Sequence, residues 1–511
     1  MPEQRKTQPM NRIKSAIISV FISTLTLSAQ SVSLQQVADQ MAADPVFSQA
    51  LAGICVISAD GTSIARVNSG KMMVPASNMK LITTGAALHE LGGEYRFETS
   101  IGYDGEIEEG TLKGNLYIIG GGDPTLGSKD SIAVVLEKTF SQWEHIVRSA
   151  GIKEIEGHVV GDGRWMDGMM EEPTWLWNDI GTYYGSGATG LMFYENMQSF
   201  SVSPGDEVGK PVRIKPSYPS CPWMDFRYTC TTGKAGTGDM LYMYTSDLYP
   251  TAEIRGTFGI DRGSKRVDCS NKFPEYTCAE YFTIYLRKHG IGCAEGAADF
   301  KLYTEWEPKG EIRIIGKTSS PSLRKIAFET NHASNNLYAE TLFRTLGKER
   351  HQSACYDSSR VAIVDVLKNL RIDTTRGHHI QDGSGLSRQN YVSADFMCRF
   401  LKAMISSPEF DNFLYSLPVP GGNGSLSYNM KSYPQGLRSR IRVKSGSMNG
   451  VRCYSGYILP ADFQYIPGQS VPEEVKSRIL IFSVLTNNCT SPNWKVRPML
   501  DRFMAEIAKT L

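Results

Sequence analysis

The sequence predicts an α/β protein: a mainly antiparallel sheet with helices, interrupted by a mostly β insert of one or two domains. Two observations predict this arrangement. Apolar, strand-like segments lie near both ends of the chain, at 52–58 and 478–486, whereas the long stretch between them is rich in glycine, tyrosine and short strand-turn units. With 511 residues, the chain is too long for one ordinary core. We therefore expect a first part of the main domain at 32–96, inserted domains at 97–315, and a second part at 316–511.

The first part contains a helix, a hairpin and a second helix in order. Residues 33–45 have apolar side chains at helical spacing. The apolar strand 52–58 turns at Asp60-Gly61 into a second strand at 64–67, which is typical of a β-hairpin. Residues 74–88 begin with a proline near the start and then contain few helix breakers, so they predict the second helix.

The insert and the second part continue this pattern. Units such as 114–120 indicate short strands, and a stretch of about 220 residues can hold one or two domains. Near the C-terminus, 442–444, 454–459 and 478–486 are strand-like. A final helix is predicted from apolar residues on one face: Leu500, Phe503, Met504, Ile507 and Leu511.

The N-terminus predicts export. Arg5, Lys6, Arg12 and Lys14 precede an uncharged, mostly apolar run at 16–29, as in a signal peptide, so we assign 1–29 to that role. The alternative is a short membrane anchor or a buried helix. No other stretch reaches about 18 apolar residues, so a mature form without a transmembrane segment is expected. The ten cysteines fit an oxidising compartment, and Cys221/Cys230 and Cys269/Cys278 are spaced as local loop-closing pairs.

Composition excludes several function classes. Lys and Arg number 54 and Asp and Glu 53, for a net charge of +1, so nothing indicates binding to nucleic acid. The chain has neither a CxxC pair nor an HExxH motif, so a zinc mechanism has little support. We expect neither a metal nor an organic cofactor.

The first chemical motif is Ser77-Asn78-Met79-Lys80 at a predicted helix start. Positions i and i+3 share a helix face, so the Ser77 hydroxyl and the Lys80 amine can meet. A serine needs a base to become a nucleophile, and a lysine can serve if burial lowers its pKa. Taken alone, the motif is also compatible with a helix-capping serine and a solvated lysine.

The second motif is Ser334-Asn335-Asn336, ahead of a helical run at 337–346. On a tight loop, Ser334 and Asn336 can face one site. Ser334 can relay a proton to a leaving group, and Asn336 can hold a substrate carbonyl. The alternative is again a helix cap, since Asn and Ser are favoured there.

The third motif is Lys444-Ser445-Gly446-Ser447 on a predicted strand. Such a strand can pair with an extended peptide, and Lys444 with the Ser445 hydroxyl can neutralise a terminal carboxylate. Gly446 would let the ligand approach the backbone closely. The backbone N–H groups of Ser77 and Ser447 would form an oxyanion hole. The alternative is an ordinary polar strand start.

Together the three motifs resemble those of penicillin-binding proteins and β-lactamases, which carry serine–x–x–lysine, serine–x–asparagine and lysine–threonine–glycine in this order. Ser445 replaces the threonine but keeps its hydroxyl. The long interval between Lys80 and Ser334 resembles the D-alanyl-D-alanine carboxypeptidase/endopeptidase family, whose catalytic domain is interrupted by a large insert. Residues 121–126, 175–179, 382–388 and 421–426 are also similar to that family.

The resemblance implies a β-lactamase/transpeptidase-like fold and a serine-type D-alanyl-D-alanine carboxypeptidase. Its expected partners are peptidoglycan stem peptides and β-lactam antibiotics, and its expected location is periplasmic or extracytoplasmic. A β-lactamase or esterase on the same fold, or a non-catalytic wall-binding module, stays open. The oligomeric state and the balance of carboxypeptidase and endopeptidase activity are not predicted.

Asp179 and Arg388 are further substrate-binding candidates. Asp179 ends the Trp-x-Trp-Asn-Asp stretch of the insert, and Arg388 ends the Asp-Gly-Ser-Gly-Leu-Ser-Arg stretch of the second part. Both stretches resemble the family at positions expected to border the cleft. One anionic and one cationic side chain could bind the amine and the carboxylate, respectively, of a diamino acid. The alternative is a structural role for each.

Overall fold

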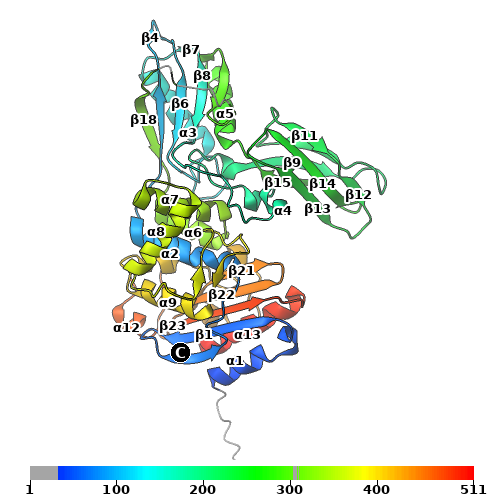
Figure 1. Cartoon of the computed structure of the whole chain (residues 1–511), viewed down its shortest axis with the longest axis vertical. Helices are drawn as coiled ribbons and strands as arrows, with labels where there is room; N and C mark the ends of the chain where they lie inside the picture. The colour runs from blue at the N-terminus through cyan, green and yellow to red at the C-terminus, as the bar shows by residue number, and fades with distance from the viewer. Residues whose placement is uncertain (1–32, 303–307, 309) are drawn as a thin grey trace, which may run out of the picture.

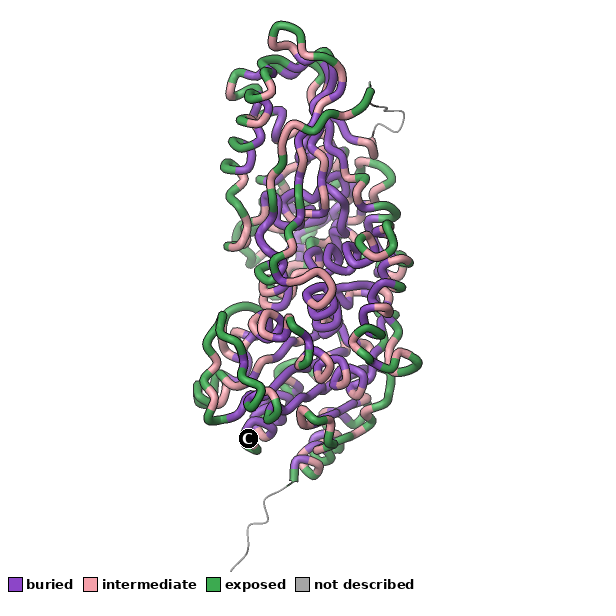
Figure 2. The backbone as a smooth tube through the Cα atoms, turned by 90° about the vertical axis from the view of Figure 1, so that its left-hand side faces the viewer, coloured by how far each residue is buried: buried purple, intermediate pink, exposed green. Residues whose placement is uncertain are grey.

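The computed structural model describes residues 33–302, 308 and 310–511, so the predicted signal peptide lies outside the described residues. A long body carries a five-stranded sheet in its lower half, and an arm projects sideways from its upper half (Figure 1). The body is continuous in side view, with buried backbone running from the lower sheet into the upper part (Figure 2).

The main sheet is built from both ends of the chain. Its strand order is β2 (Ser63–Val67), β1 (Leu51–Ser58), β23 (Leu480–Asn487), β22 (Val451–Ile458) and β21 (Ile441–Met448). Every neighbouring pair is antiparallel. Strand β23 is buried along its whole length, which explains its nearly continuous apolar sequence.

Helices cover both faces of this sheet. One face carries α1 (Leu34–Ala42) and α13 (Asn493–Lys509), packed in one apolar core with the strands. The other face carries a second core formed with α2 (Met79–Leu91), α6 (Leu323–His332), α7 (Asn336–His351), α8 (Tyr356–Asn369), α9 (Ala394–Ile405) and α10 (Phe410–Ser416). This layered arrangement is the predicted α/β sandwich.

The upper body belongs to the insert. One sheet has the order β17 (Gly296–Asp299), β8 (His158–Asp162), β6 (Leu116–Gly120), β3 (Glu98–Tyr103) and β18 (Arg313–Ser319). A smaller sheet has the order β16 (Gly292–Cys293), β7 (Glu154–Ile155), β5 (Thr111–Leu112) and β4 (Ile107–Glu108). They share an apolar core with α3 (Leu136–Ser149) and α5 (Pro274–Lys288).

The arm spans 197–270 and has its own apolar core. One sheet has the order β10 (Arg213–Ser217), β9 (Met197–Ser203) and β15 (Lys265–Ser270). In the other, β14 (Thr251–Gly259) pairs with β11 (Asp225–Tyr228), β12 (Thr231–Gly233) and β13 (Asp239–Thr245). The short helix α4 (Trp177–Ile180) packs against β13 at the base of the arm.

Short elements complete the described chain. They are the hairpin β19 (His378–His379) and β20 (Tyr391–Val392), the helices α11 (Gln435–Arg438) and α12 (Glu473–Lys476), and the 3₁₀ turns η1 (Pro45–Phe47), η2 (Ala76–Asn78), η3 (Tyr183–Gly185), η4 (Tyr194–Asn196) and η5 (Gly424–Leu426). Strand β18 runs across the expected boundary at 315, because it pairs with β3 through Ser319. The domain limits stay a prediction.

The two local cysteine pairs that the spacing allows are not formed. All ten are free thiols in the structure. Cys221 lies with its Sγ 3.6 Å from the Thr277 hydroxyl, while Cys269 belongs to β15 and Cys278 to α5. Within the described residues, no helix is long and apolar enough to cross a membrane.

Candidate active site

Ser77 lies in η2, directly before α2, and lines a cleft between the main sheet's helices and the insert. Lys80 is one turn further along, and its Nζ lies 3.0 Å from Ser77 Oγ. The same amine donates to Asn336 Oδ1 at 2.6 Å and to the backbone oxygen of Ser384 at 2.9 Å. The i, i+3 spacing therefore joins the predicted nucleophile to the predicted base.

Burial adjusts the basicity of this amine. Lys80 is fully buried, and loss of solvation lowers its pKa to about 7, while the carboxylates of Glu340 and Asp382 oppose that shift. Near neutral pH, a large fraction of Lys80 can therefore be unprotonated and can accept the Ser77 proton.

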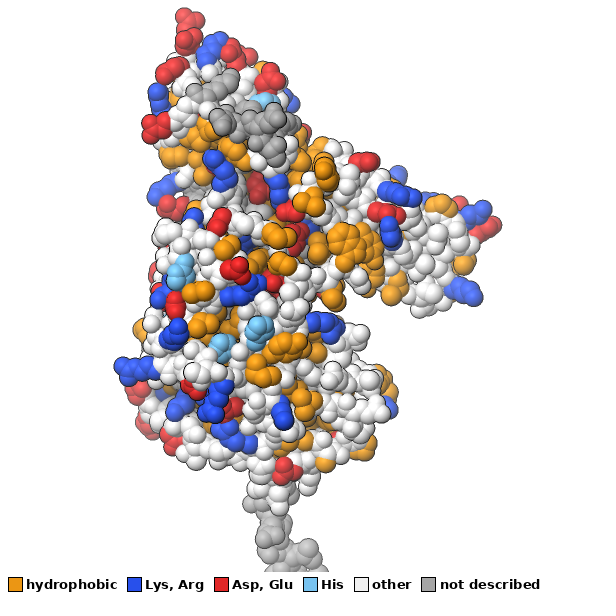
Figure 3. Space-filling view, viewed as in Figure 1, with side chains coloured by type: hydrophobic (Ala, Val, Ile, Leu, Met, Phe, Trp, Pro, Cys, Tyr) orange, Lys and Arg blue, Asp and Glu red, His pale blue; other side chains and the backbone are white. Residues whose placement is uncertain are grey.

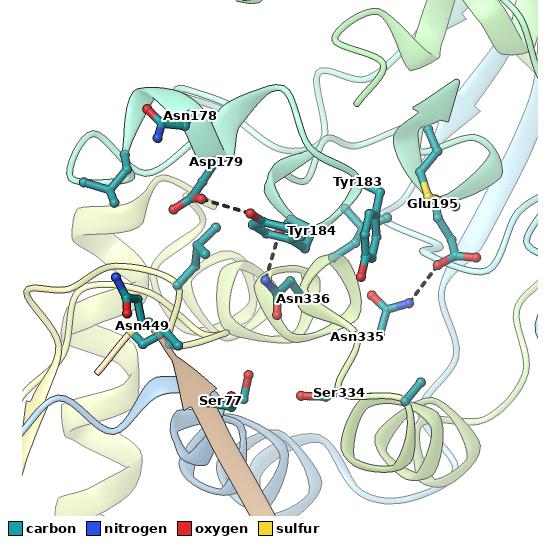
Figure 4. A pocket seen from close by; sticks show the side chains of 18 of the residues that line it. Ser77, Asn178, Asp179, Tyr183, Tyr184, Glu195, Ser334, Asn335, Asn336 and Asn449 are labelled. Atoms are coloured by element: carbon teal, nitrogen blue, oxygen red, sulfur yellow. Dashed lines mark hydrogen bonds between the residues drawn. The ribbon is translucent and has the colours of Figure 1, made fainter. Parts of the chain in front are cut away.

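The second motif occupies the loop between α6 and α7. Ser334 has a left-handed backbone conformation with φ of 60°, and Asn336 is the first residue of α7. The helix cap is the middle residue, Asn335, whose side chain accepts from the backbone N–H of Tyr338. Ser334 and Asn336 are thereby left to face the cleft (Figure 4).

Lys444 connects the third motif to the second. It lies in β21, is fully buried, and its Nζ donates to Ser334 Oγ and to the Ser445 backbone oxygen, each at 2.9 Å. Burial, together with the charge of Lys80, lowers the pKa of Lys444 well below its usual range. Ser334 therefore lies within hydrogen-bonding reach of a second buried amine.

Gly446 has a packing role that the sequence did not predict. A Cβ at this position would lie 2.3 Å from the backbone oxygen of Pro75 and 2.9 Å from the backbone nitrogen of Asn78. The glycine therefore lets β21 pack against the turn that carries Ser77, so its closest neighbour is the protein's own backbone. Ser447 is exposed one residue further and lines the cleft.

The 382–388 loop holds Lys80 from the other side. Buried Glu340 of α7 accepts from the backbone N–H groups of Gly383 and Ser384, at 3.2 and 2.7 Å. Buried Asp382 accepts from the indole of Trp175 in the insert at 2.9 Å. The loop that presents the Ser384 oxygen to Lys80 is thus fixed by both α7 and the insert.

Asp179 and Arg388 face the same cleft, which has a volume of about 710 Å³. The Tyr184 hydroxyl donates to Asp179 Oδ1 at 3.1 Å, and Arg388 Nη2 donates to the Asn449 backbone oxygen at 3.3 Å. Burial raises the pKa of Asp179, and the charge of Arg388 partly offsets this. The structure thus brings together all ten site residues that the sequence singled out, either along this cleft or, for Lys80, Lys444, Ser445 and Gly446, directly behind it.

Sequence reasoning missed several supporting residues. The Asn336 amide donates to the backbone oxygen of Tyr184, and the Asn335 amide donates to Glu195 Oε2, both at 2.8 Å (Figure 4). Burial raises the pKa of Glu195 to about 7. Tyr184 and Glu195 belong to the insert, and no local pattern marks a partner about 150 residues away. Among the described residues, no group of three or more His, Cys, Asp or Glu side chains could hold a metal ion.

Known proteins resemble this chain in sequence over most of its length. Residues 34–507 match the model of the D-Ala-D-Ala carboxypeptidase 3 (S13) family. A D-alanyl-D-alanine carboxypeptidase of Actinomadura sp. is 27% identical over 482 residues, covering 91% of this chain and 82% of the relative. A penicillin-sensitive carboxypeptidase A of Dictyostelium discoideum is 25% identical over 467 residues, covering 88% of this chain and 84% of the relative.

The fold is also shared with a solved structure. Penicillin binding protein 4 from Haemophilus influenzae superposes with a TM-score of 0.75 at 21% identity, covering 93% of this chain and 98% of the other. This likeness confirms the predicted β-lactamase/transpeptidase-like fold, and the family match confirms the resemblance read from the motifs and the prediction of a carboxypeptidase-type enzyme. The chain belongs to the D-Ala-D-Ala carboxypeptidase 3 (S13) family.

Proposed function

We propose that this chain is an exported, penicillin-binding serine peptidase that cleaves peptidoglycan stem peptides ending in D-Ala-D-Ala through an acyl-enzyme on Ser77. One observation carries the proposal. The buried amine of Lys80, with its pKa lowered to about 7, lies 3.0 Å from the Ser77 hydroxyl. A serine paired with a near-neutral amine is the arrangement that acyl transfer needs.

Acylation begins with attack of Ser77 Oγ on the carbonyl carbon between the two D-alanines. Lys80 takes the hydroxyl proton as the new C–O bond forms. The oxyanion is assigned to the backbone N–H groups of Ser77 and Ser447, because both residues line the cleft. Asn336, which accepts from Lys80, is also assigned to hold a peptide carbonyl of the substrate.

The departing D-alanine needs a proton on its amine. Ser334 is assigned this transfer, since its Oγ is hydrogen-bonded to the buried amine of Lys444. When the C–N bond breaks, Ser334 gives its proton to the leaving amine, and the proton that Lys80 took from Ser77 replaces it, so Lys80 is neutral again for the next step. Lys444 with Ser445 is also assigned to bind the carboxylate of the leaving D-alanine, whose negative charge would favour the protonated form of Lys444.

Water then hydrolyses the ester, with Lys80 accepting the water proton, and Ser77 is regenerated. The same chemistry at a cross-bridge would be endopeptidase activity. A β-lactam ring opened by Ser77 would give a long-lived acyl-enzyme. The cleft residues Asp179 and Arg388 are proposed to bind the free amine and carboxylate of a diamino acid in the stem peptide.

Two kinetic measurements on the purified protein test this function. It is expected to release D-alanine from a peptide ending in D-Ala-D-Ala and to turn over benzylpenicillin slowly after one equivalent has reacted. Rapid penicillin turnover without peptide cleavage would instead identify a β-lactamase. Absence of both reactions would favour the wall-binding alternative.

A further inference from the structure

A second groove, of about 380 Å³, lies on the arm next to the active-site cleft. We call it the arm groove. The residues that matter for its chemistry are Trp177, Tyr244, Asp225, Arg227, Glu253 and Arg255. Figure 3 shows apolar side chains gathered over α4 at the base of the arm, with basic and acidic side chains beside them.

Strand register explains how these side chains reach one surface. Tyr244 of β13 lies opposite Glu253 of β14, and Glu253 lies beside Arg227 of β11. Since side chains two residues apart share a face of a strand, Asp225, Tyr242 and Arg255 lie on this face as well. The intervening side chains, such as Met243 and Ile254, form the arm's core. The groove is therefore the outer face of the arm's sheet.

The surface combines exposed aromatic rings with fixed charges. Trp177 is 57% exposed, and its ring centroid is 6.2 Å from that of Tyr244. The Arg255 guanidinium lies 5.3 Å from the Tyr244 ring centroid and is paired with Glu253 at 2.7 Å. Glu253 also accepts from the Thr229 hydroxyl at 2.7 Å. Rings that stay exposed beside preorganised polar groups indicate a binding surface.

The arm groove continues the active-site cleft. Tyr242 lines the cleft, and Tyr244, two residues along on the same face of β13, lines the groove. Trp177 of α4 lines the groove, while its neighbours Leu176, Asn178 and Asp179 line the cleft. A polymer whose peptide enters the cleft would therefore pass over Trp177 and Tyr244.

We propose that the arm groove binds the glycan strand of peptidoglycan. This proposal rests on the proposed function, because peptidoglycan carries its stem peptides on a sugar polymer. The C–H faces of a pyranose ring are apolar and would stack on Trp177 and Tyr244. Its hydroxyl and acetamido groups would hydrogen-bond with the carboxylates and guanidinium groups around the rings. The groove then aligns the polymer and leaves the chemistry to the cleft.

Binding is tested with the Ser77→Ala protein, so that no turnover occurs. The probes are a soluble β-1,4-linked N-acetylglucosamine hexamer and peptide-free glycan strands, titrated by calorimetry and by tryptophan fluorescence. Trp177→Ala and Tyr244→Ala, each in this background, are expected to weaken binding about tenfold, the loss of one stacking contact. Tyr249→Ala is the matched control, because Tyr249 is 71% exposed on the same arm but does not line the groove.

Activity separates the groove from the catalytic site. In the Ser77 protein, Trp177→Ala and Tyr244→Ala are expected to slow D-alanine release from polymeric peptidoglycan about tenfold, yet to keep hydrolysis of a short soluble peptide within about twofold. Thermal unfolding establishes that the variants are folded. If Trp177→Ala disturbs α4, the variants Tyr244→Ala and Arg255→Ser still test glycan binding at the arm groove, because both residues lie on the arm's sheet.

The outcomes distinguish this inference from the proposed function. If the Ser77→Ala protein binds neither glycan probe, or if its groove variants bind like the Tyr249→Ala control, while the Ser77 protein cleaves the D-Ala-D-Ala peptide, the inference is wrong and the peptidase assignment stands. If glycan binding depends on Trp177 and Tyr244 but no D-Ala-D-Ala peptide is cleaved, the proposed function fails and the groove stands as a glycan site.

Discussion

Lys80 is a buried amine whose neighbours are mostly acceptors. Its Nζ meets Ser77 Oγ, Asn336 Oδ1 and the Ser384 backbone oxygen, and no solvent reaches the side chain. These contacts fix where the amine points, whereas burial decides how readily it gives up its proton. A lysine so placed differs from the solvated lysine that the short motif alone would allow.

Replacing Lys80 by arginine is expected to reduce penicillin acylation and peptide cleavage more than about a hundredfold, because a guanidinium stays protonated and cannot act as a base. Stopped-flow or quenched acylation assays measure the effect, with Lys71→Arg on an exposed position of the preceding loop as control. Acylation within about tenfold of the parent protein would refute the role of Lys80.

Acylation should also depend on pH with a definite sign. The pKa of Lys80 is lowered to about 7, so the unprotonated base increases as pH rises through that value. Between pH 6 and pH 8, the acylation rate constant is expected to rise about eight- to tenfold and then level off. A rate that is flat, or that falls over this interval, would contradict Lys80 as the base.

At the residue scale, the sequence predicted the groups that we propose to react, but not the residues that support them. Ser77 and Lys80 were predictable because three residues along a helix return to the same face. Glu340, Trp175 and Glu195 were not, because their roles depend on partners brought in from other elements. The role of Gly446 also required the packing of β21 on the Ser77 turn.

At the scale of elements, the 382–388 loop links the catalytic helix α2 to α7 and to the insert. Glu340 of α7 accepts hydrogen bonds from the backbone N–H groups of this loop, and the Trp175 indole donates to Asp382 in the loop. Both carboxylates are buried, and burial raises the pKa of each. They are tolerated because backbone N–H groups or the indole satisfy their oxygens.

Glu340→Gln tests this connection. A glutamine keeps the shape of the side chain but turns an NH₂ donor toward a backbone N–H. The free energy of unfolding, measured by urea denaturation, is therefore expected to fall by about 1–3 kcal/mol. Acylation should slow about tenfold, because the Ser384 oxygen that binds Lys80 shifts. Glu349→Gln, exposed on the same helix, is the control. Equal stability and equal acylation rates in the two variants would show that the loop does not depend on Glu340.

The elements themselves were largely predictable where the pattern was local. Strands β1 and β2 with their turn, strand β23 and helix α13 follow from apolar spacing, and the structure has them close to the predicted limits. The insert was less predictable, because parallel pairs such as β6 with β8 or β11 with β14 join segments that no turn connects. The strand order of the main sheet likewise required tertiary pairing.

At the scale of the whole molecule, the insert forms one wall of the cleft. Asp179, Tyr184 and Glu195 come from the insert, whereas Ser77 comes from the main domain (Figure 4). Arg388, also from the main domain, lines the same cleft. We therefore expect the insert to contribute to substrate binding through side chains 100 or more residues from Ser77 in sequence.

Asp179→Ala and Arg388→Ala test this contribution. Each substitution removes a charged contact that is expected to contribute about 1–3 kcal/mol to the binding of a peptide with a free diamino end. The KM for that peptide should rise accordingly. Penicillin acylation and simple D-Ala-D-Ala peptides should be spared. Arg376→Ala removes an exposed arginine elsewhere and is the control. Equal losses on penicillin and on the peptide would show that the two residues support the catalytic core instead.

The central claim is that Ser77 forms the acyl-enzyme, and intact-protein mass spectrometry after penicillin treatment tests it most directly. The parent protein is expected to gain the mass of one penicillin, with the label mapped to the peptide containing Ser77. Ser77→Ala should fold normally and gain none. Labelling that persists in Ser77→Ala, or that maps to another residue, would contradict the account.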